Sequence, residues 1–255
     1  MRTFARLIAL LALLCVAISC TNKSSEVGVP TQTKKPFVAP SASTATTISV
    51  TVHFDGTVPA PQKIDMSQDP ACGNQTHFDE SLVVDQGKLA NVLVYVKDPF
   101  HTADVYFPPP ANPVVIEQKT CRYQPHVAAA MTGQIVEFIN DDDTTHNIHP
   151  MPKNSRQWNE AQMPKAEPIK KTFNQPEIMI PIKCNQHPWM RMYLNVLDNT
   201  FFGVTGPDGR FEIKGLPPGT YTIAAVQEQL GEQDMQVTVR PKESKAVDFT
   251  FKQQP

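Results

Sequence analysis

The chain has 255 residues, a formal charge of -2 at pH 7, 24 prolines and 8% aromatic residues. Its length suits two domains, each large enough to bury its own core. The slightly acidic charge argues against nucleic acid as a partner. The high proline content favours short strands and rigid turns over long helices.

The first residues predict export and membrane anchoring. Two arginines precede an apolar run, Leu7 to Ile18, which is too short for a bilayer that needs ~20 residues and is typical of a signal peptide over residues 1–19. Small residues directly before Cys20 resemble a bacterial lipobox, in which the cysteine carries lipid; an ordinary cleaved signal is the alternative. Residues 20–45 are rich in Ser, Thr, Lys and Pro and predict a flexible tether. We expect a lipid-anchored protein on the periplasmic face of the cell envelope, and Thr21 favours the outer membrane.

The folded part is predicted to begin with strands. Apolar and polar residues alternate over 48–54, as in a half-buried strand, and residues 59–88 are irregular. Residues 89–96 are apolar on both faces, which predicts a strand inside a sheet. The proline-rich residues 98–113 predict a stiff connector and a domain junction.

The next stretch leads to a histidine. Strands are expected over 114–116, within 121–131 and over 135–139, and the last of them leads to His146. Residues 150–176 are polar and proline-rich, and no strand is predicted there.

Two kinds of segment complete the chain. Over 177–183 alternate isoleucines share a face with Cys184, so the thiol should point inward. After a strand over 193–197, turns separate short strands in an all-β tail, at 211–213, 221–226, 235–239 and 247–251. No segment has a helical period, and the whole chain is therefore predicted to be all-β.

Residues 184–192, Cys-Asn-Gln-His-Pro-Trp-Met-Arg-Met, place a thiol, an imidazole and two thioethers in one short run. Soft sulfur with imidazole is a copper ligand set, and a His2Cys site with a weak axial Met binds a redox-active copper ion. Cys184 and His187 supply two ligands, with Met190 or Met192 in the axial position.

The remaining ligand should be a distant histidine, and His146 fits because it follows a strand on another segment. The adjacent acids Asp141–Asp143 cannot all face one ion, so a solvated turn is predicted there. His77, His101 and His126 lack companion spacing, and His149 is more typical of a packed or supporting position. His53 lies in a predicted strand and should point away from the core into solvent.

The cysteine count favours a disulfide. Of the five cysteines, Cys15 leaves with the signal, Cys20 carries lipid and Cys184 binds metal. Cys72 and Cys121 remain in an oxidising compartment, where they are expected to pair. The alternative, that one of them ligates metal, has no tightly spaced cysteine or histidine in its support.

Residues 114–197 resemble the cupredoxins, small Greek-key β-sandwiches that hold one type 1 copper ion. The run 184–191 is similar to the short ligand loop of amicyanin, and residues 146–149 resemble the first-histidine loop of amicyanins and plastocyanins. The resemblance implies that Asn147 ties the two ligand loops together. Met192 has the axial spacing of plastocyanin-like loops, whereas the Pro-Trp-Met-Arg run favours Met190.

A second resemblance covers the flanks. Thr205 to Val226 is similar to the second half of a carboxypeptidase-regulatory-like, transthyretin-like sandwich. This predicts a sandwich split into residues 46–112 and 199–252, with a cupredoxin domain, residues 113–198, inserted between them. Two consecutive sandwiches are the alternative.

These observations together predict a membrane-anchored copper protein that carries electrons and is not an enzyme, since its site has no open position for substrate. In cupredoxins the second loop histidine reaches the surface within an apolar patch, so a redox protein should dock near His187 and Trp189. The patch would comprise Pro150, Met151, Pro152, Pro188 and Trp189. Copper storage or delivery, and a surface binding module with structural copper, are the alternatives.

Overall fold

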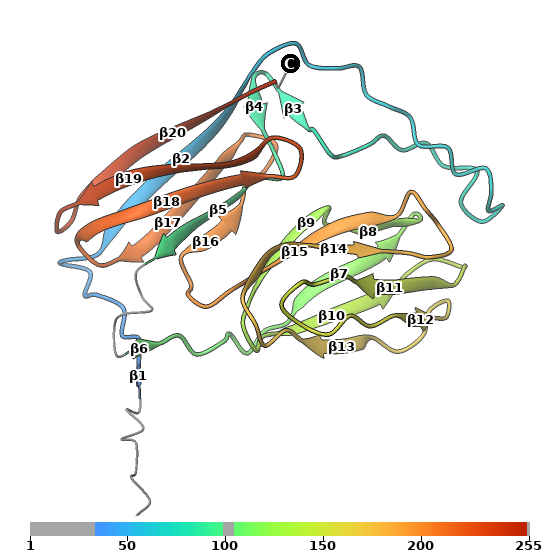
Figure 1. Cartoon of the computed structure of the whole chain (residues 1–255), viewed down its shortest axis with the longest axis horizontal. Coiled ribbons are helices and arrows are strands. Elements are labelled where there is room, and N and C mark those ends of the chain that lie inside the picture. Colours follow the sequence, from blue (N-terminus) through green and yellow to red (C-terminus); the bar gives the residue numbers. More distant parts are fainter. Residues whose placement is uncertain (1–33, 99–104, 254–255) are drawn as a thin grey trace, which may run out of the picture. The chain divides into compact units, whose positions relative to one another are not determined.

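The computed structural model describes residues 34–98 and 105–253, and every regular element within these ranges is a β-strand (Figure 1). The all-β prediction is confirmed. The predicted signal peptide, Cys20 and most of the tether lie outside the described residues, as does His101. Among the described residues, no helix has the length and apolarity that a membrane span requires.

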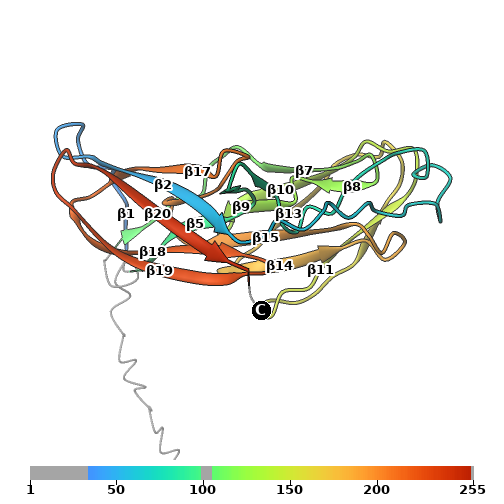
Figure 2. The ribbon, with the colours of Figure 1, turned by 90° about the horizontal axis from the view of Figure 1, so that it is seen from above.

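One pair of sheets combines strands from both ends of the described chain. The first sheet has the order β16-β5-β18-β19: Phe202–Val204, Leu93–Asp98, Gly219–Gln227 and Gly231–Val239. The second has the order β17-β2-β4-β3, with β20 also paired to β2: Arg210–Leu216, Thr46–Asp55, Lys88–Leu89, Val84–Asp85 and Ser244–Lys252. Strand β2 pairs antiparallel with β17 and parallel with β20 (Figure 2). Both sheets therefore need strands from before residue 99 and from after residue 201.

The core of this pair lies between its two sheets. Alternate residues of β2 are buried there, with Ile48, Val50 and Val52 packed against Val94 and Ile223 of the facing sheet. A fully buried side chain of this size contributes about 1.5–3 kcal/mol relative to an exposed one. The alternation predicted for residues 48–54 therefore supplies one wall of a sandwich core.

The strand predicted over residues 89–96 is divided. Leu89 ends β4 in one sheet, and β5 begins at Leu93 in the other. Asn91 between them has a φ of 59°, a left-handed conformation that turns the chain. Strand β5 is internal, as predicted, because β16 and β18 flank it.

A second pair of sheets is built from residues 114–197. One has the order β13-β10-β7-β8: Ile169–Thr172, Ile135–Asn140, Val114–Lys119 and Arg122–Gln124. The other has the order β12-β11-β14-β15-β9: Glu160–Gln162, His146–Pro150, Glu177–Lys183, Arg191–Leu197 and Val127–Met131. A short parallel pair, β1 (Lys35–Pro36) and β6 (Val105–Tyr106), completes the strands of the described chain. The edge strands β12 and β13 lie in residues 150–176, where none was predicted, because three or four residues are too few to show a pattern.

The predicted alternation over residues 177–183 is interrupted by a bulge near the start of β14. The register shifts between Glu177 and Ile180, and Met179 has a φ of 55°. The buried amide of Asn195 stabilises the bulge, since its Oδ1 accepts a hydrogen bond from the backbone N–H of Met179 at 2.8 Å. Ile180 and Ile182 still share the core that contains Cys184, but Ile178 packs against a different apolar cluster.

Residues 59–83 lack regular strands, as predicted, but the prediction of irregular structure is wrong for residues 84–88, where β3 and β4 form a short antiparallel pair. The segment 59–80 is anchored in two ways. Cys72 forms a disulfide with Cys121, which immediately precedes β8. Met66 and Cys72 are buried in the same apolar cluster as Phe138 and Cys184. The segment therefore packs against the second pair of sheets.

We expect Gly203→Ala to lower the free energy of unfolding by about 1–3 kcal/mol, the usual cost of overpacking. Gly203 lies in β16, and a Cβ atom there would overlap the aromatic ring of Phe211. The matched control is Gly206→Ala, whose Cβ would meet its nearest neighbour, Asp208 Oδ1, at 3.4 Å. Urea unfolding measures both variants, and equal midpoints would contradict the expectation.

Candidate metal centre

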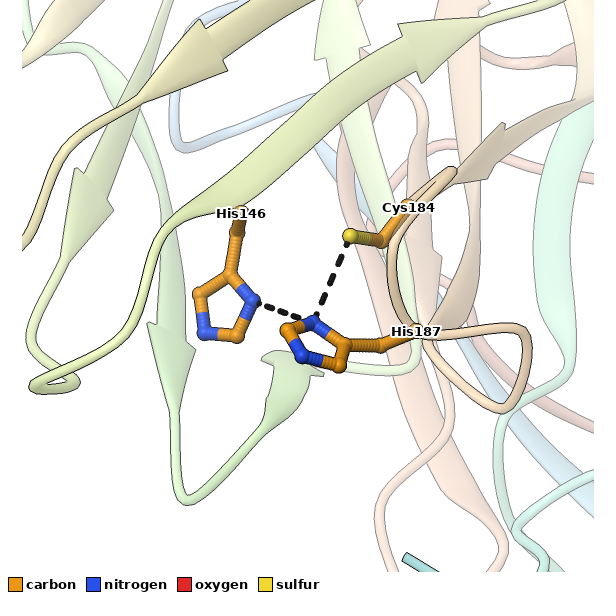
Figure 3. A group of neighbouring side chains, drawn as sticks. All are labelled: His146, Cys184 and His187. Carbon is orange, nitrogen blue, oxygen red and sulfur yellow. Dashed lines mark hydrogen bonds between the residues drawn. The ribbon is translucent and has the colours of Figure 1, made fainter. Parts of the chain in front are cut away.

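Three side chains from the strands and loops of the second pair of sheets converge (Figure 3). His146 is the first residue of β11, Cys184 directly follows β14, and His187 lies in the loop before β15. The Nδ1 atoms of the two imidazoles are 2.9 Å apart, and Cys184 Sγ is 3.6 Å from His187 Nδ1. Their exposed fractions are 0%, 4% and 3%, so water is largely excluded from the cluster.

Backbone hydrogen bonds fix the loop that carries Cys184 and His187. The N–H of Cys184 donates to the carbonyl oxygen of Met190 at 3.1 Å. The N–H of Met190 donates to the carbonyl oxygen of His187 at 2.9 Å. The N–H of Asn147 donates to Cys184 Sγ at 3.3 Å. The backbone amide of Asn147 in β11 therefore contacts the thiol that follows β14.

The environment of Cys184 favours the thiolate. Burial raises the pKa of the thiol, but interaction with His146 and hydrogen bonds from the backbone N–H groups of Asn147, His187 and Gln186 lower it to about 6. A metal-binding cysteine must be deprotonated. The apo protein already provides this state near neutral pH.

Asn140 shapes the loop that presents His146. Its buried amide nitrogen donates to the carbonyl oxygens of Thr144 at 2.9 Å and Gln162 at 3.0 Å, and its Oδ1 accepts from the N–H of Asp142 at 3.0 Å. These bonds tie both ends of the polar loop to the sheet. The position of His146 is therefore set by an asparagine six residues earlier.

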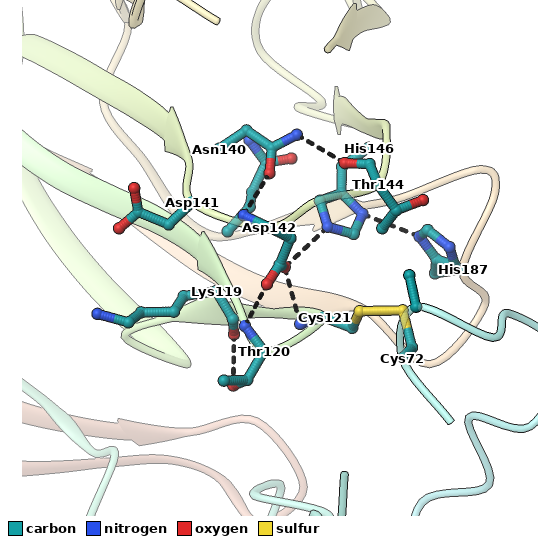
Figure 4. Close-up of polar contacts among 12 residues, drawn as sticks. Cys72, Lys119, Thr120, Cys121, Asn140, Asp141, Asp142, Thr144, His146 and His187 are labelled. Carbon is teal, nitrogen blue, oxygen red and sulfur yellow. Dashed lines mark hydrogen bonds and ion pairs between the residues drawn. A yellow bond between two sulfur atoms is a disulfide. The ribbon is translucent and has the colours of Figure 1, made fainter. Parts of the chain in front are cut away.

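Asp142 is a partner of His146, and the prediction of a solvated turn is wrong for this residue. Its Oδ2 is 2.9 Å from His146 Nε2, and the carboxylate also accepts hydrogen bonds from the N–H groups of Thr120 at 2.6 Å and Cys121 at 2.8 Å (Figure 4). Only 11% of its side chain is exposed. Burial raises the pKa of Asp142, but the hydrogen bonds from His146 and Cys121 outweigh it and lower the pKa, so the carboxylate is ionised.

Asp69 takes the same position at His187. Its Oδ2 is 2.8 Å from His187 Nε2 and accepts a hydrogen bond from the hydroxyl of Thr144 at 3.0 Å. The hydrogen bond from His187 is the main cause of the lowered pKa of Asp69. His187 is consequently buried under this carboxylate, whereas the resemblance implied an imidazole that reaches the surface. Sequence reasoning missed Asp69 because its partner is 118 residues away.

The other residues of interest are placed as follows. Met190 and Met192 are both buried in the apolar cluster that contains Cys184. Trp189 is half-buried, its indole N–H donates to the carbonyl oxygen of Cys121 at 3.1 Å, and its ring lies 5.1 Å from that of His187 between centroids. Among the described residues, the remaining histidines bond to other groups: His53 to Asp248, His77 to Gln75, His126 to Glu228 and His149 to Asn185.

The donor atoms fit a copper ion. Both Nε2 atoms are engaged by carboxylates, and the two Nδ1 atoms face each other beside the thiol. The three side chains offer donor atoms within 4.8 Å of one another. One thiolate with two imidazoles suits copper, and the same donors can also hold zinc. The described structure therefore contains a buried group of one cysteine and two histidines that could hold a metal ion.

Comparisons with protein-family models and with curated proteins find no match. Among solved structures, the chain is similar to a purple cupredoxin from Nitrosopumilus maritimus, at 20% identity over 32% of this chain and 98% of that one, with a TM-score of 0.28. It is also similar to a Cu-containing nitrite reductase from Thermus scotoductus, at 18% identity over 58% of this chain and 29% of that one, with a TM-score of 0.32. An oxidised proline-to-glycine mutant of amicyanin matches at 18% identity over 40% of this chain and 97% of that one, with a TM-score of 0.31.

Proposed function

We propose that this chain is a mononuclear type 1 copper protein that carries electrons, with His146, Cys184 and His187 as its equatorial ligands. The observation that supports this most directly is the convergence of two imidazole Nδ1 atoms and a buried thiol on one point. When bound, copper supplies the exchange of one electron between Cu(I) and Cu(II). The protein supplies fixed donors and the exclusion of water.

We propose Met190 as the axial ligand. Lys183 pairs with Arg191 and Ile182 with Met192, so Met190 lies directly across from Cys184. The hydrogen bond from the N–H of Cys184 to the carbonyl oxygen of Met190 continues this pairing. Met192 lies further along the strand, beside Ile182, and therefore belongs to the core below the site.

A carrier accounts for this arrangement better than an enzyme does. The proposed donors are all buried, and a methionine in the fourth position leaves no coordination site for a substrate. Electron carriers meet their partners through small interfaces that release quickly. We place the docking surface for a redox protein beside Trp189, which is half-buried and adjacent to His187.

We further propose that residues 113–198 are a cupredoxin domain inserted into a transthyretin-like sandwich made of residues 46–112 and 199–252. The pairing of β2 with β17 and β20 supports this arrangement over two consecutive sandwiches. In this proposal Cys20 carries the lipid that anchors the protein at the periplasmic face of the outer membrane.

Loading the purified chain with Cu(II) tests the proposal. We expect one copper ion per chain and an intense visible absorption, because charge transfer from the Cys184 thiolate to copper requires a direct bond. A colourless adduct, or a chain that retains zinc and excludes copper, would contradict the proposal. Electron self-exchange should be fast; slow exchange with ready release of copper would instead indicate storage or delivery.

A further inference from the structure

We propose that Asp69 is a positioning residue for the metal centre: it holds His187 through Nε2, and the disulfide between Cys72 and Cys121 keeps it in place. This inference rests on the proposed function. It assigns a role to a residue outside the ligand loops and to a segment, 59–80, that contains none of the ligands.

Each imidazole is hydrogen-bonded to a carboxylate, but one carboxylate is close to its histidine in the sequence and the other is distant. Asp142 lies four residues before His146 in the same loop, whereas Asp69 is 118 residues from His187. Each carboxylate is within 2.9 Å of the Nε2 atom of its histidine. A proton held at Nε2 leaves Nδ1 with a free lone pair, which is the tautomer that a metal bound at Nδ1 requires.

The carboxylate of Asp69 is itself fixed on both oxygens. Oδ1 accepts a hydrogen bond from the N–H of Ala71 at 2.8 Å, and Oδ2 accepts one from the hydroxyl of Thr144 at 3.0 Å. The backbone oxygen of Asp69 accepts from the N–H groups of Cys72 at 2.9 Å and Gly73 at 2.8 Å. This tight turn connects Asp69 rigidly to the cysteine three residues later.

The disulfide connects the two segments that hold the carboxylates of Asp69 and Asp142. On one side, Cys72 ends the turn that begins at Asp69. On the other side, the N–H of Cys121 donates to Asp142, the partner of His146. One covalent bond therefore ties together the two carboxylates that orient the imidazoles. His187, with 4% of its side chain exposed, is shielded by this assembly.

A carboxylate that accepts the hydrogen bond from Nε2 makes the imidazole a stronger metal ligand through Nδ1. A stronger ligand stabilises Cu(II) more than Cu(I), because Cu(II) carries the higher positive charge and binds a basic nitrogen more tightly. Asp69 is therefore expected to lower the reduction potential of the site, and its loss should raise it.

The test compares Asp69→Asn with Asp65→Asn in the full chain. Asp65 is an exposed acid of the same segment whose carboxylate accepts a hydrogen bond from the N–H of Ser67. We expect Asp69→Asn to weaken Cu(II) binding by about 10- to 100-fold, the usual effect of losing such a partner. Cu(I) binding should change less, so the reduction potential should rise, and Asp65→Asn should match the wild type.

A second readout needs no copper. Nitrogen NMR of the metal-free protein reports the tautomer of His187, which should be Nε2-protonated in the wild type and mixed in Asp69→Asn. Thr144→Val, which keeps the charge of Asp69 and removes one of its donors, should shift both readouts in the same direction by a smaller amount. Unchanged tautomer and affinity in Asp69→Asn would overturn the inference. A wild type without the thiolate-to-copper absorption would refute the proposed function, while the metal-free measurement would still decide the role of Asp69.

Discussion

Cys184→Ser is expected to abolish the visible absorption of the copper-loaded protein and to weaken Cu(I) binding by more than about 100-fold, since losing an outer partner alone costs about 10- to 100-fold. Cys184 is the free cysteine among the described residues, and its buried thiol lies 3.6 Å from His187 Nδ1. A serine hydroxyl stays protonated near neutral pH and is a hard donor, which Cu(I) does not favour. Absorption spectroscopy and competition with a Cu(I) chelator measure the two effects.

Met192→Leu is the control for this variant. It changes a sulfur-containing side chain in the same core but leaves the proposed donors intact. It should keep the colour and the affinity, with a small change in stability because the two side chains have similar volumes. A coloured Cys184→Ser protein would show that the absorption does not come from this thiolate, and the proposed ligand set would then be wrong.

Replacing both Cys72 and Cys121 by alanine is expected to lower the free energy of unfolding of the metal-free protein by about 4 kcal/mol, the value that chain entropy gives for this separation. The disulfide joins residues 49 positions apart, and both cysteines are buried in the core beside the site. Without it, the turn that carries Asp69 loses its covalent attachment. Urea unfolding gives the difference.

A reduced wild-type protein provides the matched comparison, because it lacks the bond but keeps both sulfur atoms. It should lose nearly as much stability as the double variant, the small difference being the cavity left by two alanines. A loss below about 1 kcal/mol in both would mean that the segment 59–80 is held by its packing alone, and the disulfide would then have no strong effect on Asp69.

Local patterns in the sequence reveal part of this structure. The alternation over residues 48–54 predicts β2 because a strand exposes every second side chain to the core. The run from Cys184 to Met192 predicts three of the four proposed ligands because a short loop brings near neighbours together. The same run does not contain His146. Its prediction as a ligand required the further argument that a distant histidine follows a strand on another segment.

Other features depend on contacts that no local pattern shows. The bulge at Met179 is stabilised by Asn195 of the neighbouring strand, so spacing within β14 could not predict it. Asp142 could have been found from its position four residues before His146, since both flank one loop. Asp69 had no such signal, because its contact with His187 exists only after the segment 59–80 has folded against the site.

The parallel pairing of β2 with β20 has a consequence for the order of folding. His53 in β2 bonds to Asp248, which is synthesised 195 residues later. Strand β2 can pair with β4 early, but it lacks its neighbour β20 until the chain is almost complete. Every strand from Val114 to Leu197 finds its sheet partners within that stretch. Because closing long loops is slow, the sheets around the histidines should assemble while β2 is still waiting for its C-terminal partner.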